Sequence, residues 1–223
     1  GDSTPLALLL GTFVLALVLR LSVSLALAVL ASAAVGVLTG LATLVLARRL
    51  LEQLAAVFGQ LLEQVQQSAG PGTEVVMQAP TQLQLAGMMG AANAILAVLC
   101  LALARHWQAA LYNPGGFGSE FRALRLPVGV TAALALGAAG LTALGLEYRS
   151  WAACLLVPVT VVGFALVHAR AAQRGASRGW LTAFYALWLL FDAAKLLLVG
   201  FAVLDAWVDF RARWQRGGKD GEN

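Results

Sequence analysis

The stretch that decides the fold lies at residues 84–104 and reads QLAGMMGAANAILAVLCLALA. It belongs to a longer run without any charged side chain, which begins after Glu74 and ends before Arg105. A helix of about 20 apolar residues crosses the roughly 30 Å hydrocarbon layer of a bilayer. In that layer every backbone polar group must find a partner inside the protein, so such a run folds as a helix. The stretch therefore predicts a helix that crosses a membrane.

The rest of the chain repeats this pattern. Uncharged runs also separate Arg20 from Arg48, Arg125 from Glu147 and Arg149 from Arg170. The 223 residues are 60% hydrophobic and 12% charged, whereas a soluble domain carries about 25% charged residues. This composition excludes a soluble enzyme, and also a disordered chain, which combines low hydrophobicity with high net charge. We predict an all-α polytopic membrane helix bundle that forms one integral membrane domain over residues 1–223.

Six transmembrane helices are expected, at about 6–19, 22–46, 84–104, 127–146, 151–167 and 180–205. A polar C-terminal tail is expected at 212–223. The chain starts with Gly-Asp-Ser-Thr-Pro rather than with Met, so we expect that further N-terminal residues precede it.

Residues 48–67 follow a different pattern. Their apolar side chains recur every three or four residues, and Glu and Gln occupy the opposite face. This spacing predicts an amphipathic helix that lies in the membrane interface or packs on a neighbour. A partner-binding helix or a short coiled coil is the alternative.

Positive charge does not orient the predicted bundle. When the loops alternate between the two sides, seven Arg or Lys residues fall on each. The first side carries Arg20, Arg105, Arg122, Arg125, Arg170, Arg174 and Arg178, and the second carries Arg48, Arg49, Arg149, Arg211, Arg213, Arg216 and Lys219.

A stripe of small residues runs along the second predicted helix, and consists of Ala28, Ser32, Gly36 and Gly40. The spacing of four residues places these side chains on one face, where they allow two helix backbones to approach closely. The stripe indicates either packing within the bundle or docking of a partner membrane subunit.

Two charged residues, Asp192 and Lys195, interrupt the sixth apolar run. On a continuous helix they share a face with Tyr185 and Trp188. Charges at membrane depth usually face the interior of a bundle or a wet cavity. We therefore predict that these four side chains line a pocket for a small molecule, with a self-contained structural ion pair as the alternative.

The segment between Trp107 and Pro127 carries a strong turn signal, Asn113-Pro-Gly-Gly116. The other candidate ligand-binding residues lie in it, and are Asn113, Phe117, Glu120 and Arg122. The exit from the last helix, Asp205-Ala-Trp-Val-Asp-Phe-Arg211, is expected to be solvated at the level of the lipid headgroups.

Motifs of bond-breaking chemistry are missing from the sequence. It contains no HExxH, no GxSxG and no Walker A pattern, and we expect that the chain is not an enzyme. Cys100 and Cys154 lie in apolar runs without a CxxC pair, so neither a metal site nor a cofactor is expected. Without a basic helix or an aromatic platform, no nucleic-acid partner is expected either.

Across essentially its whole length the sequence resembles the YybS-like family of bacterial membrane proteins of unknown function. The resemblance lies in Trp107 with Leu-Tyr-Asn-Pro-Gly-Gly-Phe at 111–117, Glu120-Phe121, Leu-Arg-Leu-Pro at 124–127, and Gly200 with the Asp205–Arg211 exit. Members of this family usually carry further N-terminal helices.

That family is distantly similar to the S components of energy-coupling-factor transporters, which bind a ligand and dock onto partner subunits. The resemblance implies a multi-pass protein of the bacterial inner membrane, with its C-terminus in the cytoplasm. It also implies a transport component that binds a small molecule or lipid. The alternative is a non-catalytic scaffolding subunit of a membrane-protein complex.

Overall fold

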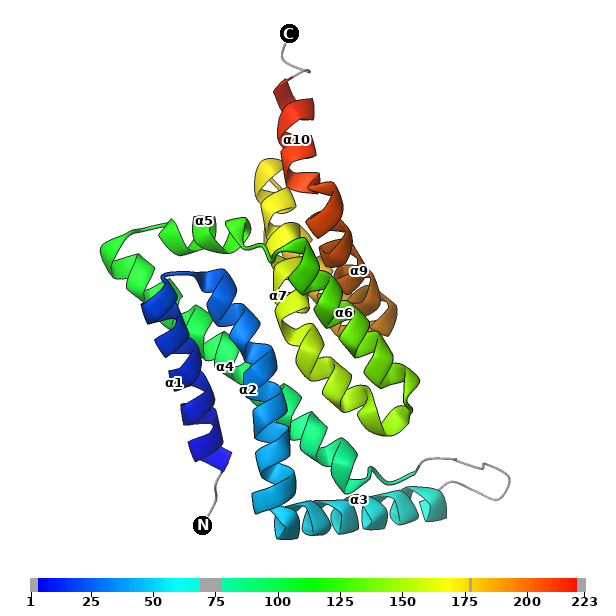
Figure 1. Ribbon diagram of the computed structural model, residues 1–223. Coiled ribbons are helices and arrows are strands. Elements are labelled where there is room, and N and C mark those ends of the chain that lie inside the picture. The colour runs from blue at the N-terminus through cyan, green and yellow to red at the C-terminus, as the bar shows by residue number, and fades with distance from the viewer. Residues whose placement is uncertain (1–3, 69–77, 177, 220–223) are drawn as a thin grey trace.

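The computed structural model describes residues 4–68, 78–176 and 178–219, and every regular element in this part of the chain is a helix (Figure 1). The α-helices are α1 (Thr4–Ser22), α2 (Leu25–Leu46), α3 (Arg48–Ser68), α4 (Gln82–Tyr112), α5 (Gly116–Ala123), α6 (Val128–Ala143), α7 (Arg149–Gln173), α8 (Arg178–Leu190), α9 (Asp192–Val208) and α10 (Phe210–Lys219). A short 3-10 turn, Leu146–Tyr148, precedes α7. The expected all-α helix bundle is confirmed.

The centre of the bundle is formed by α2, α4 and α7, which pack closely on one another. Gly36 of α2 and Gly90 of α4 meet so closely that a Cβ on Gly90 would collide with the Gly36 carbonyl oxygen. One turn away, Asn93 Nδ2 donates a hydrogen bond to Thr39 Oγ1 at 2.8 Å. Van der Waals contact and interhelical hydrogen bonds hold helices together where lipid surrounds them. The small residues of α2 and α4 therefore position the whole bundle.

Trp151, in the first turn of α7, joins the same three helices. Its ring occupies the space that Gly40 and Gly87 leave open, since a Cβ on either glycine would lie 2.8 Å from a ring carbon. Its Nε1 donates to the Leu83 carbonyl oxygen at 3.0 Å. The indole thus fills a notch between α2 and α4 and satisfies its only donor there.

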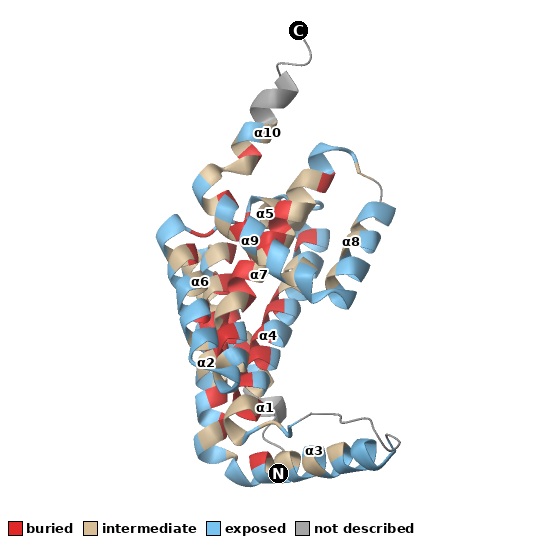
Figure 2. Cartoon of the chain, turned by 90° about the vertical axis from the view of Figure 1, so that its right-hand side faces the viewer, coloured by how far each residue is buried: buried red, intermediate tan, exposed pale blue. Residues whose placement is uncertain are grey.

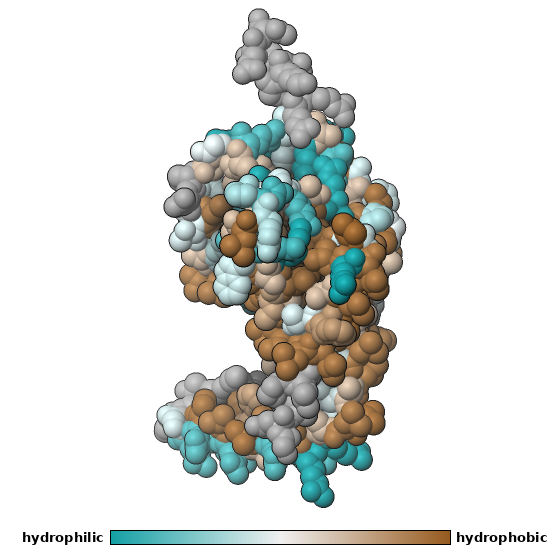
Figure 3. Space-filling model, turned by 90° about the vertical axis from the view of Figure 1, so that its left-hand side faces the viewer, coloured by the Kyte–Doolittle hydropathy of each residue, from teal (hydrophilic) through white to brown (hydrophobic). Residues whose placement is uncertain are grey.

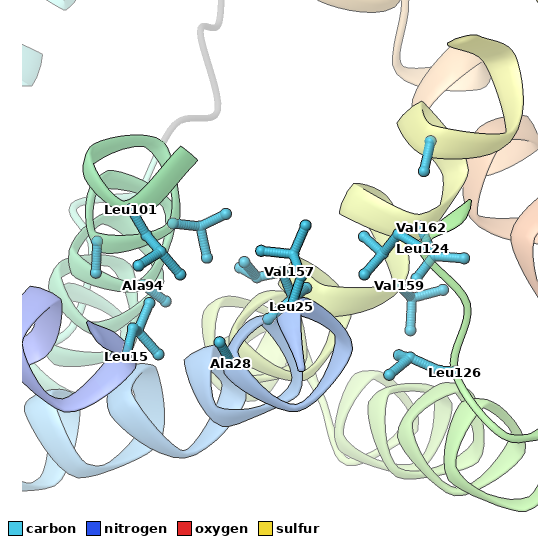
Figure 4. Packing of buried hydrophobic residues seen from close by; sticks show 14 of the residues in the cluster. Leu15, Leu25, Ala28, Ala94, Leu101, Leu124, Leu126, Val157, Val159 and Val162 are labelled. Atoms are coloured by element: carbon cyan, nitrogen blue, oxygen red, sulfur yellow. The ribbon is translucent and has the colours of Figure 1, made fainter. Parts of the chain in front are cut away.

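Buried side chains follow the axis of the bundle, whereas α8 carries only exposed and partly buried ones among its described residues (Figure 2). In the core, Leu15 of α1 and Ala28 of α2 cluster with Ala94 of α4 and Val157 of α7 (Figure 4). Leu124, which follows α5, belongs to the same cluster and anchors α5 to the end of the bundle.

Two helices lie across the ends of the bundle. α3 projects at one end and α5 crosses the other, from which α10 extends (Figure 1). Figure 3 shows a hydrophobic band between these ends, with hydrophilic side chains around α5 and α10 and along the outer side of α3. The helix predicted at 48–67 is confirmed as α3, and its apolar residues Val57, Leu61 and Val65 are about half exposed.

Three helical segments are long and apolar enough to cross a membrane alone: α2, α4 and Leu146–Gln173. Two bent pairs qualify only as pairs, α5 with α6 at 70° and α8 with α9 at 112°. The apolar part of α1, Leu8–Ser22, is shorter. The described chain is therefore membrane-embedded with three to five candidate spans, rather than the expected six.

Several boundaries differ from the expected ones. α4 runs past Arg105, which pairs with Glu120, as far as Tyr112. The helix ends where Pro114 follows its cap Asn113. The expected polar tail is helical as far as Lys219, because it continues α10, at whose start Asp209 Oδ1 accepts from Ala212 N at 3.1 Å; residues 220–223 lie outside the described residues.

The helix expected at 180–205 is broken at Phe191, which has extended backbone angles of φ −119° and ψ 119°. Asp192 begins α9, where the positive end of the helix dipole favours a carboxylate. Lys195 pairs with it one turn later, at 2.7 Å. The charge that interrupts the apolar run thus starts a new helix instead of lining a continuous one.

Candidate ligand site at the α5 end of the bundle

The break at Phe191 separates the residues of the predicted pocket. Tyr185 and Trp188 lie on α8, whereas Asp192 and Lys195 lie on α9 beyond the 112° bend. The Asp192 side chain is 92% exposed and its partner is Lys195, as the alternative interpretation expected. The structure thus corrects the prediction that these four side chains share one helix face.

Tyr185 and Trp188 instead join a cluster of rings between α7 and α8. The Phe164 ring of α7 lies 5.4 Å from the Tyr185 ring and 4.9 Å from the Trp188 ring, between centroids. The Tyr185 hydroxyl lies 2.7 Å from His168 Nε2, and the His168 ring packs edge-on against Phe121 of α5. This cluster therefore connects α8 to α5.

The turn predicted at Asn113-Pro-Gly-Gly116 ends α4 and determines where α5 begins. Asn113 caps α4, and Gly115 has a φ of 83°, a left-handed conformation that glycine adopts without strain. Phe117, just beyond this turn, packs on the core and lies 6.1 Å from the His106 ring. The turn thus reverses the chain, and Phe117 fastens α5 across the end of the bundle.

The two charged candidates of α5 face opposite sides. Glu120 accepts from Arg105 Nη2 at 2.5 Å, and both line a hollow of about 410 Å³ between α1, α4 and α5, which we call the α1–α5 hollow. Arg20 and Gln108 also line it. Arg122 lies on the other side of α5, away from this ion pair.

Arg122 lines a second hollow of about 430 Å³ between α5, α7 and α10, the α5–α10 hollow. Its residues are Ser119, Arg122, Ala123, Arg125, Ala169, Ala172, Gln173, Arg211 and Trp214. Arg170 packs 4.6 Å above the Trp214 ring in a cation–π contact and donates to Gln173 Oε1 at 3.0 Å. Arginine residues from three segments of the chain therefore converge on one hollow.

The most buried of these arginines, Arg211, belongs to the segment expected to be solvated. Arg211 is 7% exposed and its Nε lies 3.4 Å from Oδ2 of Asp205, which is 4% exposed. Its Nη1 donates to the Arg122 carbonyl oxygen at 2.7 Å and so ties α10 to α5. No local pattern in the sequence predicts this pair, because it depends on the left-handed conformation of Asp209 at φ 52°.

Asp209 forms a second, more exposed ion pair in the same region. Its Oδ1 lies 2.7 Å from Arg125 Nη2. The hydrogen bond from Arg125 lowers the pKa of the Asp209 carboxyl, and the bond from the Ala212 amide lowers it further. Burial lowers the pKa of Arg211, an effect that the nearby Asp205 carboxylate opposes.

The small-residue stripe of α2 lies inside the bundle. Ala28 and Ser32 are fully buried, and Cβ atoms on Gly36 or Gly40 would press on α4 and α7. The stripe therefore serves packing within the bundle. This placement corrects the expected role of these four residues in docking a partner.

Within the described ranges, no three histidine, cysteine or carboxylate residues gather in a group that could hold a metal ion. Comparisons of the chain with protein-family models, with curated proteins and with solved structures return no match. Function must therefore be inferred from the residues and geometry of the chain itself.

Proposed function

We propose that the chain is an integral membrane protein that binds a small molecule or lipid at the α5 end of its bundle. The observation that carries this proposal is the pair of polar hollows that flank α5. Binding sites of membrane bundles lie between helices, and a few polar groups there fix the orientation of a largely apolar ligand. Both hollows combine such groups with the ends of apolar helices.

The proposed mechanism is binding rather than bond chemistry. Around the α5–α10 hollow the polar groups are guanidinium, amide and hydroxyl, which recognise a ligand by charge and hydrogen bonds. In the α1–α5 hollow, Glu120 is already neutralised by Arg105. Because α5 lies between both hollows, we propose that it acts as a lid over the bound ligand.

The resemblance to the YybS-like family supports the rest of this proposal, a transport component that works with partner subunits in the bacterial inner membrane. The structure adds an argument about orientation. Ten arginines of the described ranges lie at the α5 end, and are Arg20, Arg105, Arg122, Arg125, Arg170, Arg174, Arg178, Arg211, Arg213 and Arg216, against Arg48, Arg49 and Arg149 at the α3 end. Loops rich in Arg and Lys stay in the cytoplasm, so we place the α5 end and the C-terminus there.

Native mass spectrometry of the full chain, released from nanodiscs, tests the proposal. We expect a small molecule or lipid bound at one copy per chain. Glu120→Gln and Arg122→Gln should reduce its retention, whereas Glu63→Gln, on the polar face of α3, should not.

The alternative is a scaffolding subunit of a membrane complex. The observation that favours it is the half-exposed apolar face of α3, with Val57, Leu61 and Val65. An empty bundle that co-purifies with a protein partner at fixed stoichiometry, and that loses this partner on Leu61→Glu, would establish the scaffold and overturn the binding proposal.

A further inference from the structure

We infer that the α5–α10 hollow is a binding site for a phosphomonoester. This inference rests on the proposed function and names the chemical class of its ligand. Arg122, Arg125 and Arg211 line the hollow together with Ser119 and Gln173, and no carboxylate residue is among its lining residues. Asp205 and Asp209 line a different hollow, which shares Arg125 with this one.

The first argument is an unused donor on a buried side chain. The Arg211 guanidinium makes its ion pair through Nε and its hydrogen bond through Nη1. Nη2 is buried and has no hydrogen-bond partner among the described residues. Leaving a buried charged donor unsatisfied is costly, so an acceptor from outside the chain fits this position.

The second argument is uncompensated charge. Asp209 and Asp205 neutralise Arg125 and Arg211, but no carboxylate of the described chain forms an ion pair with Arg122. Arg170 adds a further cation beside the hollow, above the Trp214 ring. The hollow is therefore positively charged and selects an anion.

The third argument is the match between these donors and a phosphate group. A phosphomonoester carries close to two negative charges at neutral pH and offers three strong acceptor oxygens. The planar fork of a guanidinium binds two such oxygens at once. Arginines from α5, from the loop after it and from α10 line the hollow, and their donors suit the three oxygens of a phosphate dianion better than the two oxygens of a carboxylate.

The position of the hollow allows two sources for this group. It lies between α5, α7 and α10 at one end of the bundle (Figure 1), the level at which a membrane protein meets the phosphates of lipid headgroups. The hollow is open rather than enclosed, so a soluble phosphomonoester could also enter it. Phosphatidic acid and glycerol 3-phosphate both carry a phosphomonoester. The first presents it from the membrane and the second from solution.

The test is a titration of the full chain by native mass spectrometry, with phosphatidic acid, phosphatidylglycerol or phosphatidylcholine as the added lipid. Glycerol 3-phosphate is added in a separate arm. The variant is Arg122→Gln, since Arg122 supports no ion pair whose loss would unfold the protein. The matched control is Arg174→Gln, which removes the same charge at the same end of the bundle from an exposed residue that lines neither hollow.

We expect the first phosphatidic acid, or glycerol 3-phosphate, to bind more tightly than the other lipids. Arg122→Gln should weaken this binding about tenfold or more, and Arg174→Gln should leave it unchanged. Preference for the lipid identifies a headgroup site, and binding of glycerol 3-phosphate alone identifies a soluble ligand. Equal losses in both variants would show general attraction to a basic surface and would overturn the inference.

Absence of phosphate binding also overturns it. If another ligand then co-purifies and depends on Glu120, the proposed binding function stands without the phosphate site. If the bundle is empty, both fail.

Discussion

Replacing Gly90 with alanine tests whether the contact between α2 and α4 holds the bundle together. The added Cβ would collide with the Gly36 carbonyl oxygen and lie 3.1 Å from Gly40 N. Both atoms belong to the backbone, so the helices must separate. Overpacking of this kind costs about 1–3 kcal/mol, or more when the backbone cannot yield. Alanine also improves helix propensity by about 1 kcal/mol, which is too little to offset a collision between two helix backbones.

A graded series makes this reasoning measurable. At Gly36 a Cβ would lie 3.1 Å from Ala94 Cβ and 3.2 Å from both Cys154 Cβ and the Gly90 carbonyl oxygen. These contacts are tight but short of the collision at Gly90, so Gly36→Ala should cost less. At Gly200, in the middle of α9, no atom lies within 4 Å, and Gly200→Ala should be neutral or slightly stabilising. Thermal unfolding in nanodiscs should give melting temperatures that fall in the order Gly200→Ala, Gly36→Ala, Gly90→Ala. A Gly90→Ala protein as stable as the Gly200→Ala protein would refute the account of this contact.

Three further predictions concern the ends of the bundle. Asp205→Ala leaves Arg211 buried without its ion pair and should destabilise the protein by about 3–5 kcal/mol, whereas the double variant with Arg211→Leu should recover part of this loss in chemical unfolding. Because Arg125 lowers the pKa of Asp209, the stabilisation from their ion pair is complete above the ordinary value of 3.8 and disappears as the pH falls through the lower folded value. As the pH is lowered into the acid range, the melting temperature of Asp209→Asn should therefore fall less steeply than that of the unchanged protein. Leu61→Glu should release α3 from the bilayer surface and speed its amide hydrogen exchange, whereas exchange in α4 should not change.

The helical class and the amphipathic helix could be predicted from the sequence because each depends on local composition. The uncharged runs predicted α2, α4 and α7, and the recurrence of apolar side chains every three or four residues at 48–67 predicted α3. The turn at Asn113 was also visible, since proline and glycine act on their own backbone. These features need no knowledge of what lies next to the segment.

The candidate site could be predicted only in part. Arg122, Glu120 and Phe117 were found because they follow a recognisable turn, and the structure places Arg122 in the α5–α10 hollow. The break at Phe191 was missed because the same apolar composition is compatible with one continuous helix and with two helices joined at a bend. Arg211 was missed because its burial depends on the left-handed turn at Asp209 between α9 and α10, and on the carbonyl oxygen of Arg122, which is distant in the sequence.

The notch that receives Trp151 also fixes an order for assembly during synthesis. Synthesis of α2 and α4 is complete at Tyr112. Trp151 lies in α7, which leaves the ribosome later and only then can fill the notch. Helices that are already inserted can associate before later ones arrive. We therefore expect the α2–α4 pair to form first, with Gly40 and Gly87 facing lipid until α7 closes the notch. Ribosome-arrested chains that end between α4 and α7 should form a crosslink between cysteines placed at Thr39 and Asn93, whose side chains meet across α2 and α4. Failure to crosslink until α7 has been inserted would contradict this order.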